Sequence, residues 1–556
     1  MAEARAATPV PVREPIDWDR VRALVDAALP STEVHAAAPG LAVAVSIGSE
    51  VVWSYCLGLA NVEHRVAIDA DTRFRIASIS KQMVASVVVM LADDGVLQLD
   101  DKLHAHLPAF AAFDPPVTLR HLLTMTSGLH EVTHLGWLAT GDQGSSRISQ
   151  TEWRRLMMSQ RAPGFPAGSR YLYNNANYML LQWVVEEATG KTLAALLNER
   201  LFEPLDMHNT LLPELPTRWP SDLANGYQRA VDGCFDVPNG WRNSGAAGGI
   251  LSSLNDMARW TLNLQANRLL PADLTQRLTE PFVHPNGGRS HYGLGLASGA
   301  HAGRSWYGHA GGLAGFSTDQ FVVPSHDIAV TVLANRDDIK TMRLSRRLAD
   351  HLIDGHSVLD ACFADPPAPV PDALMPRCGV YVSVAAGRVV EIGAGPGLLT
   401  ANGLLLENCG PSQAMVLIGD EPVIYEWSDA VGLRESHASG QEAVLHRAQL
   451  VQPDAALTAD LVGCYGLDEV GARWNVEVDG EGPDAGLRFR IDNPWRDADA
   501  FNLLQAAPDL LVIAPAGGKP QANSVLVVER DQIGRVSALI GHFDRSRSLR
   551  LRRLES

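Results

Sequence analysis

The chain has few cysteines, no long apolar run and no apolar leader at its start. Six cysteines stand among 556 residues, and none forms a C-x-x-C pair or the spacing of a metal site. The scattered cysteines are therefore expected to be buried and to act as small apolar residues. Free thiols of this kind are usual in a reducing compartment. No stretch reaches the roughly 18 to 20 consecutive apolar residues of a membrane span, and no signal-peptide core is present. We therefore expect a cytoplasmic protein that does not enter a membrane.

Positive charge is also scarce. Lys and Arg number 46 against 63 Asp and Glu, and the formal net charge at pH 7 is −17. A surface of that sign repels phosphate backbones and anionic lipid, so nucleic acid and membranes are disfavoured as partners. The chain is 46% hydrophobic, which at this length is enough for two to four packed domains.

The pattern of residues changes at one proline-rich stretch. Residues 1–15 are typical of a flexible tail, and residues 364–372 contain four prolines, which is typical of a stiff linker. Residues 16–363 mix helical and strand patterns. After the linker, helical periodicity nearly disappears and short alternating runs recur, which indicates antiparallel β structure.

Two segments after the linker are similar to each other. Gly379-Val380-Tyr381 opens the first and Gly463-Cys464-Tyr465 opens the second. We therefore expect two small antiparallel β-barrel domains, at residues 373–452 and 457–556. A single larger β domain is the alternative.

Residues 16–363 predict an α+β domain. An early hairpin and several late strands are expected to share one antiparallel sheet, with helices packed on it and a helical lobe at residues 96–215 beside it. Helices are expected at 17–29 and 339–355 and, in the lobe, within 117–129 and at 153–160, 178–190 and 193–201. The expected strands are 40–47, 51–56, 292–296, 305–309, 316–323 and 328–334.

The most informative stretch runs from Arg75 to Lys81 and leads into the apolar residues 83–91. That run has no polar face, so it predicts a buried helix whose first turn carries Ser78 and Lys81. Residues three apart on a helix are neighbours, which brings the Lys81 amine within reach of the Ser78 hydroxyl. A serine activated by a lysine is a nucleophile. In the alternative interpretation Ser78 is only a helix N-cap and Lys81 only a first-turn charge.

Two further motifs offer partners for Ser78. Nucleophilic catalysis requires a group that relays the proton and donors that hold the oxyanion. Tyr173 and Asn175 form a Tyr-x-Asn motif, with a phenol and an amide. His309 and Gly311 form a His-x-Gly motif in a glycine-rich strand, where backbone can approach a ligand closely. Each motif alone also fits a helix cap or a β-bulge, but their combination favours catalysis.

Together these motifs resemble those of the penicillin-recognising serine hydrolases, which include class C β-lactamases, D,D-peptidases, related esterases and D-aminopeptidases. Residues 74–81 are similar to the family's Ser-x-x-Lys element, 173–175 to its Tyr-x-Asn, and 309–311 to a His-x-Gly form of its Lys-x-Gly strand. The resemblance covers roughly residues 35–345 and implies a β-lactamase-like fold. It also implies the roles: Ser78 as catalytic nucleophile, Lys81 and Tyr173 as acid–base partners, Asn175, His309 and Gly311 in substrate binding, and the backbone of Ser78 and Gly312 around the oxyanion.

Two departures indicate the branch of the family. His309 replaces a lysine that would pair with a substrate carboxylate, and two β domains follow the catalytic one. Both features are similar to the D-aminopeptidase branch, which implies an acyl-enzyme hydrolase that releases an N-terminal D-amino acid from short peptides, amides or esters. The alternatives are an esterase or weak β-lactamase or D,D-peptidase of the same fold, and a non-catalytic binding or scaffold protein.

Cofactors and partners are predicted as well. No metal or cofactor is needed, and the expected partners are a small-molecule or short-peptide substrate and a second copy of the chain in a homodimer. An aminopeptidase must also recognise a substrate ammonium. Residues 492–500 interrupt the strand rhythm with three acids, and we expect this loop to cover the cleft, with Asp497 or Asp499 binding the amine. A solvated surface turn is the alternative.

Overall fold

The computed structural model describes most of the chain. The predicted tail at 1–15, residues 364–368 of the linker and residues 492–499 of the acidic loop lie outside the described residues. The structure describes residues 16–29, 37–140, 148–214, 219–230, 232–238, 244–266, 271–363, 369–395, 398–402, 404–408, 412–418, 421–428, 432–437, 440–467, 470–480, 486–491, 500–515, 524–543 and 546–554.

A six-stranded antiparallel sheet forms the centre of the N-terminal part. Its strand order is β2-β1-β12-β11-β10-β9, so the early hairpin joins the late strands where Leu41 pairs with Ala334. This confirms the predicted shared sheet. The strands are β1 (Leu41–Ile47), β2 (Glu50–Leu57), β9 (Ala297–His301), β10 (Arg304–Leu313), β11 (Phe316–Val323) and β12 (Ile328–Ala334).

Helices cover the sheet. Helix α11 (Thr341–Asp354) packs on β11 and β12 and also contacts α1 (Trp18–Asp26), and α9 (Leu254–Ala266) packs on β1 and β12. Every residue of β12 is buried, and because side chains alternate between the two faces of a strand, both faces are covered.

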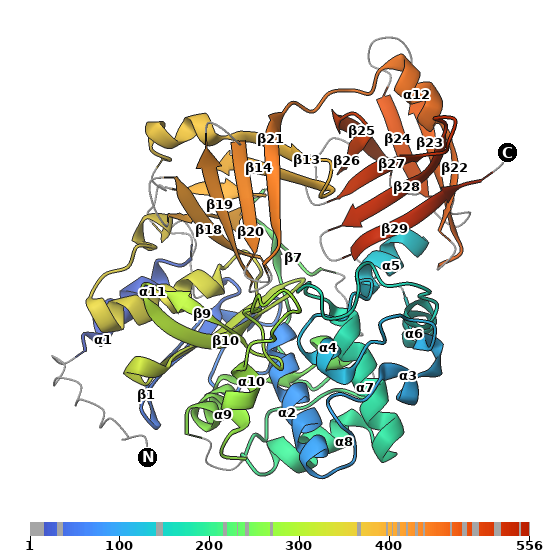
Figure 1. Ribbon diagram of the computed structural model, residues 1–556. Coiled ribbons are helices and arrows are strands. Elements are labelled where there is room, and N and C mark those ends of the chain that lie inside the picture. The colour runs from blue at the N-terminus through green and yellow to red at the C-terminus, as the bar shows by residue number, and fades with distance from the viewer. Residues whose placement is uncertain are drawn as a thin grey trace, which may run out of the picture.

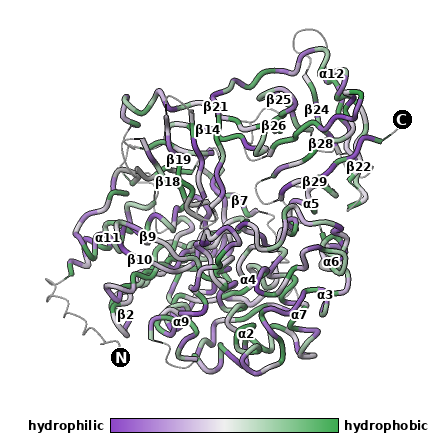
Figure 2. The backbone as a smooth tube through the Cα atoms, viewed as in Figure 1, coloured by the Kyte–Doolittle hydropathy of each residue, from purple (hydrophilic) through white to green (hydrophobic). Residues whose placement is uncertain are grey.

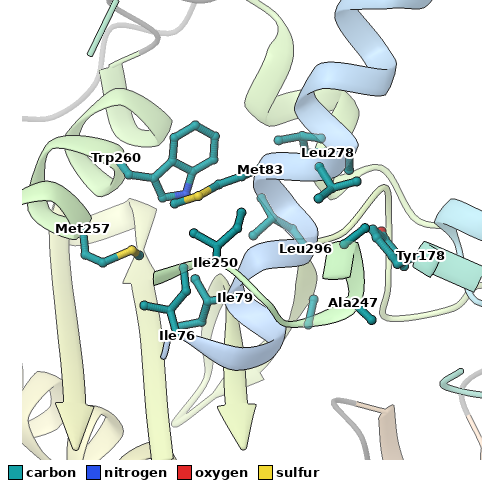
Figure 3. Packing of buried hydrophobic residues seen from close by; sticks show 14 of the residues in the cluster. Ile76, Ile79, Met83, Tyr178, Ala247, Ile250, Met257, Trp260, Leu278 and Leu296 are labelled. Carbon is teal, nitrogen blue, oxygen red and sulfur yellow. The ribbon is translucent and has the colours of Figure 1, made fainter. Parts of the chain in front are cut away.

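Helix α2 (Ser80–Asp93) runs through the middle of this part of the chain. All residues from Ser80 to Leu91 are buried, which agrees with the absence of a polar face. Figure 3 shows Met83 of α2 beside Ile250 and Trp260, and the tube in Figure 2 is green along much of α2. The remaining helices are α3 (Leu103–His106), α4 (Leu119–Leu123), α5 (Val132–Thr140), α6 (Gln150–Met158), α7 (Asn175–Thr189), α8 (Leu193–Leu197) and α10 (Leu274–Thr279).

The strand predicted at residues 292–296 is wrong. The extended chain begins only at Ala297, where β9 starts. The Gly293 N–H donates to the Leu296 carbonyl at 2.9 Å, and Gly295 has a φ of +83°. Glycine permits this left-handed conformation, so the segment turns instead of extending.

Cysteine is more exposed than predicted. Cys234 is exposed, and Cys56, Cys378 and Cys464 are partly exposed, so the predicted burial is wrong for these four. Within the described ranges no helix is both long enough and apolar enough to cross a membrane.

The C-terminal part is built mainly of antiparallel strands. Strands β13 to β21 form one nine-stranded sheet, and β22 to β29 form a closed barrel preceded by α12 (Ala455–Leu461). Figure 1 shows the two β units side by side above the N-terminal part. The predicted β-barrel architecture is confirmed, and the boundaries at 363, 373, 452 and 457 stay predictions. The strands are β13 (Gly379–Ser383), β14 (Arg388–Ala394), β15 (Leu399–Ala401), β16 (Leu404–Leu405), β17 (Glu407–Asn408), β18 (Gln413–Ile418), β19 (Glu421–Ser428), β20 (Gly432–His437), β21 (Glu442–Ala448), β22 (Gly463–Leu467), β23 (Ala472–Asp479), β24 (Gly486–Ile491), β25 (Ala500–Ala507), β26 (Leu510–Pro515), β27 (Val525–Arg530), β28 (Val536–Phe543) and β29 (Ser546–Arg553).

Both β units begin with the same hydrogen-bonded corner. The Tyr381 hydroxyl donates to the carbonyl four residues earlier at 2.9 Å, and the Tyr465 hydroxyl does the same at 2.7 Å. In each unit a late arginine pairs across the sheet with this tyrosine, Arg447 with Tyr381 and Arg553 with Tyr465. The shared geometry supports the relation inferred from the two Gly-x-Tyr motifs.

Helix α5 of the helical lobe completes the core of the closed barrel. Trp137 and Leu138 are buried in one cluster with the apolar residues of the barrel. The Trp137 ring lies 5.5 Å from those of Trp474 and Phe501 and 5.3 Å from that of Phe543. The Trp474 indole N–H also donates to the Leu138 carbonyl at 3.0 Å. The barrel therefore shares its core with the lobe.

We expect Trp137→Ala to destabilise the barrel by about 3–5 kcal/mol, because it removes a large buried ring from this cluster. Urea unfolding followed by near-ultraviolet circular dichroism measures the change in the transition. Trp137→Phe, which keeps an aromatic ring, is the matched control and should lose less. An unchanged unfolding midpoint for Trp137→Ala would show that α5 does not support the barrel core.

Candidate active site

Ser78 lies in a single 3₁₀ turn, Ala77–Ile79, directly before α2. It therefore precedes the α-helix, whereas the sequence predicts it within the first α-helical turn. Neither Ile76 nor Ile79, the N-cap residues of the two helical segments, makes a side-chain cap, and Ser78 holds neither cap position. The Ser78 hydroxyl instead accepts a hydrogen bond from Lys81 Nζ at 3.0 Å. The interpretation of Ser78 as an N-cap is wrong.

Strand β10 holds this turn in place at close range. A Cβ on Gly311 would collide with the Ile76 carbonyl oxygen and lie 3.1 Å from Ala77 Cβ, so only glycine permits the approach. The Thr318 hydroxyl on β11 donates to the same Ile76 carbonyl at 3.0 Å. Ala77 itself has a φ of +50°, a strained value for a residue with a Cβ that the surrounding contacts must maintain.

Lys81 is fully buried behind Ser78. Its Nζ donates to Ser78 Oγ at 3.0 Å, to Asn175 Oδ1 at 2.9 Å and to the Ala247 carbonyl at 2.5 Å. The Tyr173 ring centre lies 4.9 Å from the same nitrogen. The amine is thus fixed by neutral acceptors and faces the serine oxygen.

Glu131 fixes the asparagine that binds the lysine. Its carboxylate is fully buried and accepts from the Asn175 backbone N–H at 2.5 Å and from Asn175 Nδ2 at 3.0 Å. This orientation turns Asn175 Oδ1 towards Lys81. The Glu131 backbone N–H donates to Ser546 Oγ of β29 at 2.9 Å, so a chain of hydrogen bonds joins the closed barrel to Ser78.

His309 is buried and neutral. Its Nδ1 lies 2.6 Å from the Ala310 carbonyl, which can only accept, so Nδ1 carries the proton and Nε2 accepts from the Tyr292 hydroxyl at 2.8 Å. Burial, followed by the charge of Lys81, lowers the pKa of His309 to about 3. The imidazole therefore carries no charge near neutral pH.

These groups meet at a cleft of about 520 Å³ between the helical lobe and β10. Lys81 lies behind Ser78, and Asp497 and Asp499 lie outside the described residues. The segment after β12 adds the charged residues Asp337, Lys340 and Arg343 to the lining of the cleft. The predicted site residues that line the cleft are Ser78, Tyr173, Asn175, His309, Gly311 and Gly312.

Comparison with known proteins matches this part of the chain to a family. The model of the family described as Beta-lactamase matches residues 21–354. The chain belongs to the beta-lactamase family. Membership of this family supports a hydrolase. It also confirms the β-lactamase-like fold that the Ser-x-x-Lys, Tyr-x-Asn and His-x-Gly motifs predict.

Similarity to other proteins extends beyond the residues that the family model matches. A D-aminopeptidase of Gluconobacter oxydans is 28% identical over 81% of this chain and 84% of its own length. A D-aminopeptidase of Brucella ovis is 26% identical over 90% of this chain and 93% of its own. The crystal structure of a D-stereospecific amidohydrolase from Streptomyces sp. is 22% identical, with a TM-score of 0.50, and matches 62% of this chain and all of its own, which supports the fold.

Two residues of this beta-lactamase-family site carry no sequence motif. Glu131 follows His130 in a stretch that mixes polar and apolar residues, where an isolated acid gives no signal in the sequence. Tyr292 belongs to the segment predicted as a strand. Among the described residues no group of three His, Cys, Asp or Glu side chains is placed to hold a metal ion.

We expect Glu131→Gln to lower the rate at which Ser78 reacts by between about tenfold and a hundredfold, because it removes charge-assisted hydrogen bonds to Asn175. The measurement is the labelling rate with a fluorophosphonate, together with hydrolysis of a chromogenic acyl ester. Glu187→Gln, an exposed change on α7, is the control and should react like the wild type. Equal rates for both variants would remove Glu131 from the site.

Proposed function

We propose that this protein is a serine hydrolase that forms an acyl-enzyme and releases an N-terminal D-amino acid from short peptides, amides or esters. The observation that carries the proposal is the 3.0 Å contact between Lys81 Nζ and Ser78 Oγ at the edge of the cleft. The D-aminopeptidases of Gluconobacter and Brucella, similar over most of the chain including the β units, support the substrate class.

In the proposed mechanism Lys81 removes the Ser78 proton as the serine oxygen attacks the substrate carbonyl. In this role Lys81 is uncharged, so its nitrogen accepts from the Ser78 hydroxyl across the 3.0 Å contact instead of donating to it. The backbone N–H groups of Ser78 and Gly312 hold the oxyanion. Tyr173 protonates the leaving amine, and water then hydrolyses the acyl-enzyme. Asn175 and His309 orient the substrate.

The neutral state of His309 supports an aminopeptidase over a carboxypeptidase or β-lactamase. A lysine at this position would offer a fixed positive charge to a substrate carboxylate. The imidazole, with a pKa lowered to about 3 by burial and by Lys81, offers none. Strand β10 therefore favours a substrate without a carboxylate at that point.

A free substrate amine requires a carboxylate in reach. Asp497 and Asp499 stay predicted candidates on the acidic loop. Among the described residues that line the cleft, Asp337 is the acidic one, and its carboxylate also accepts from the Gly315 N–H at 3.2 Å. The predicted homodimer and cytoplasmic location stay predictions.

Ser78→Ala should abolish turnover and covalent labelling by a fluorophosphonate, because the attacking oxygen is removed. Mass spectrometry of the labelled wild type should place the adduct on Ser78. Ser325→Ala, an exposed serine before β12, is the control and should label normally. Turnover retained by Ser78→Ala would refute the assignment.

We expect D-alanine p-nitroanilide to be cleaved at least about a hundredfold faster than the L-isomer, since a site shaped for one configuration misplaces the other. The same panel includes p-nitrophenyl butyrate and a chromogenic cephalosporin, with kcat/KM measured for each. Preference for the butyrate would indicate an esterase, and preference for the cephalosporin a β-lactamase. Absence of turnover and of labelling would indicate a non-catalytic protein.

A further inference from the structure

A second cavity, of about 510 Å³, lies where the helical lobe meets both β units. Its walls come from residues 164 and 170–173 of the lobe, from the first β unit around β14, β20 and β21, and from β27, β28 and β29 of the closed barrel. Figure 1 shows these strands above the lobe. Tyr173 lines both this junction cavity and the cleft of Ser78.

Each of the three parts contributes an arginine to the junction cavity. These are Arg170 of the lobe, Arg388 of β14 and Arg547 of β29. Burial, followed by the charge of Arg388, lowers the pKa of Arg170. Burial and the charges of Arg547, Arg170 and Arg388 lower the pKa of His542, which lines the same cavity, to about 4. The cavity therefore gathers positively charged side chains in a chain whose net charge is −17.

Acidic residues offset only part of this charge. Glu435 Oε1 accepts from Arg388 and from His437, both at 2.6 Å, so this carboxylate offsets charge within the first β unit, while its Oε2 makes no hydrogen bond among the described residues. Glu442, the other acid that lines the cavity, is exposed. Arg170 makes no hydrogen bond or ion pair within the part of the chain that the structure describes. A small anion would balance the charge of Arg170, and a guanidinium group binds a carboxylate through two parallel hydrogen bonds.

The shared wall indicates the source of such an anion. If Tyr173 protonates the leaving amine, the leaving part of the substrate begins beside its ring. The segment from Arg170 to Tyr173 then leads from that amine into the junction cavity. The volume is in the range of about 300–1,000 Å³ that is usual for small-molecule sites.

We propose that the junction cavity is the subsite for the leaving part of the substrate, in which Arg170 and Arg547 bind the free carboxylate of a short D-aminoacyl peptide. This inference rests on the proposed function. If the inference holds, free peptides are better substrates than the corresponding amides. Their carboxylate is then bound in the junction cavity and not at β10, where the neutral His309 offers no charge.

The test compares D-Ala-Gly-Gly with its C-terminal amide, using kcat/KM of the full-length protein. We expect the wild type to prefer the free peptide by at least about tenfold, because the amide loses charge-assisted hydrogen bonds. Arg170→Gln and Arg547→Gln should each reduce this ratio about tenfold, and Arg170→Lys should reduce it less. Arg473→Gln, an exposed arginine of β23, is the matched control and should keep the wild-type ratio. Thermal unfolding checks that each variant is folded.

Four results would overturn the inference. Equal rates for peptide and amide, with D-alanine p-nitroanilide still cleaved, would refute it while the proposed function stands. No cleavage of any D-aminoacyl substrate would refute both. If Arg343→Gln lost the preference for the free peptide and Arg170→Gln kept it, the carboxylate would be bound in the cleft of Ser78, at the segment that follows β12. Inorganic phosphate that stabilises the wild type but not Arg170→Gln, without any preference for the free peptide, would indicate a site for a free anion.

Discussion

A buried amine needs hydrogen-bond acceptors, and this requirement at Lys81 organises the centre of the molecule. Its Nζ contacts Ser78, Asn175 and the Ala247 carbonyl, which come from the 3₁₀ turn before α2, the start of α7 and the 3₁₀ helix Gly245–Ala247 before β8 (Leu251–Ser252). Moving any of the three away would leave a polar group unsatisfied in the core, at a cost of about 1–3 kcal/mol or more. Three segments far apart in the sequence are therefore fixed relative to one another. The cleft lies between them and β10.

The requirement extends outwards through Glu131. The Glu131 carboxylate accepts from the backbone N–H and from Nδ2 of Asn175. The side-chain oxygen of Asn175 therefore points to Lys81. Glu131 directly precedes α5, and Trp137 of α5 lies in the barrel core. The backbone N–H of Glu131 donates to the Ser546 hydroxyl. The electrostatics at Ser78 and the packing of the barrel are thus parts of one arrangement, which gives the C-terminal β units a structural role at the cleft.

The sequence was informative where structure depends on near neighbours. Ser78 and Lys81 are three residues apart, and the hairpin and the buried helix follow from local periodicity. Glu131 and Tyr292 contact partners 44 and 17 residues away, and no local pattern encodes such contacts. The segment 292–296 alternates like a strand, but its glycines allow a turn that only the packing selects. The placement of α5 in the barrel is equally non-local, because its apolar residues fit a lobe helix as well as a barrel core.

The way α5 packs also limits how this architecture can be divided. A beta-lactamase-family domain whose helix ends inside its neighbour is no longer an interchangeable module. Without the barrel, Leu135, Trp137 and Leu138 would face water as an apolar patch, a surface that promotes association between copies. Replacement of this barrel by another would therefore have to include α5 to keep the shared core intact.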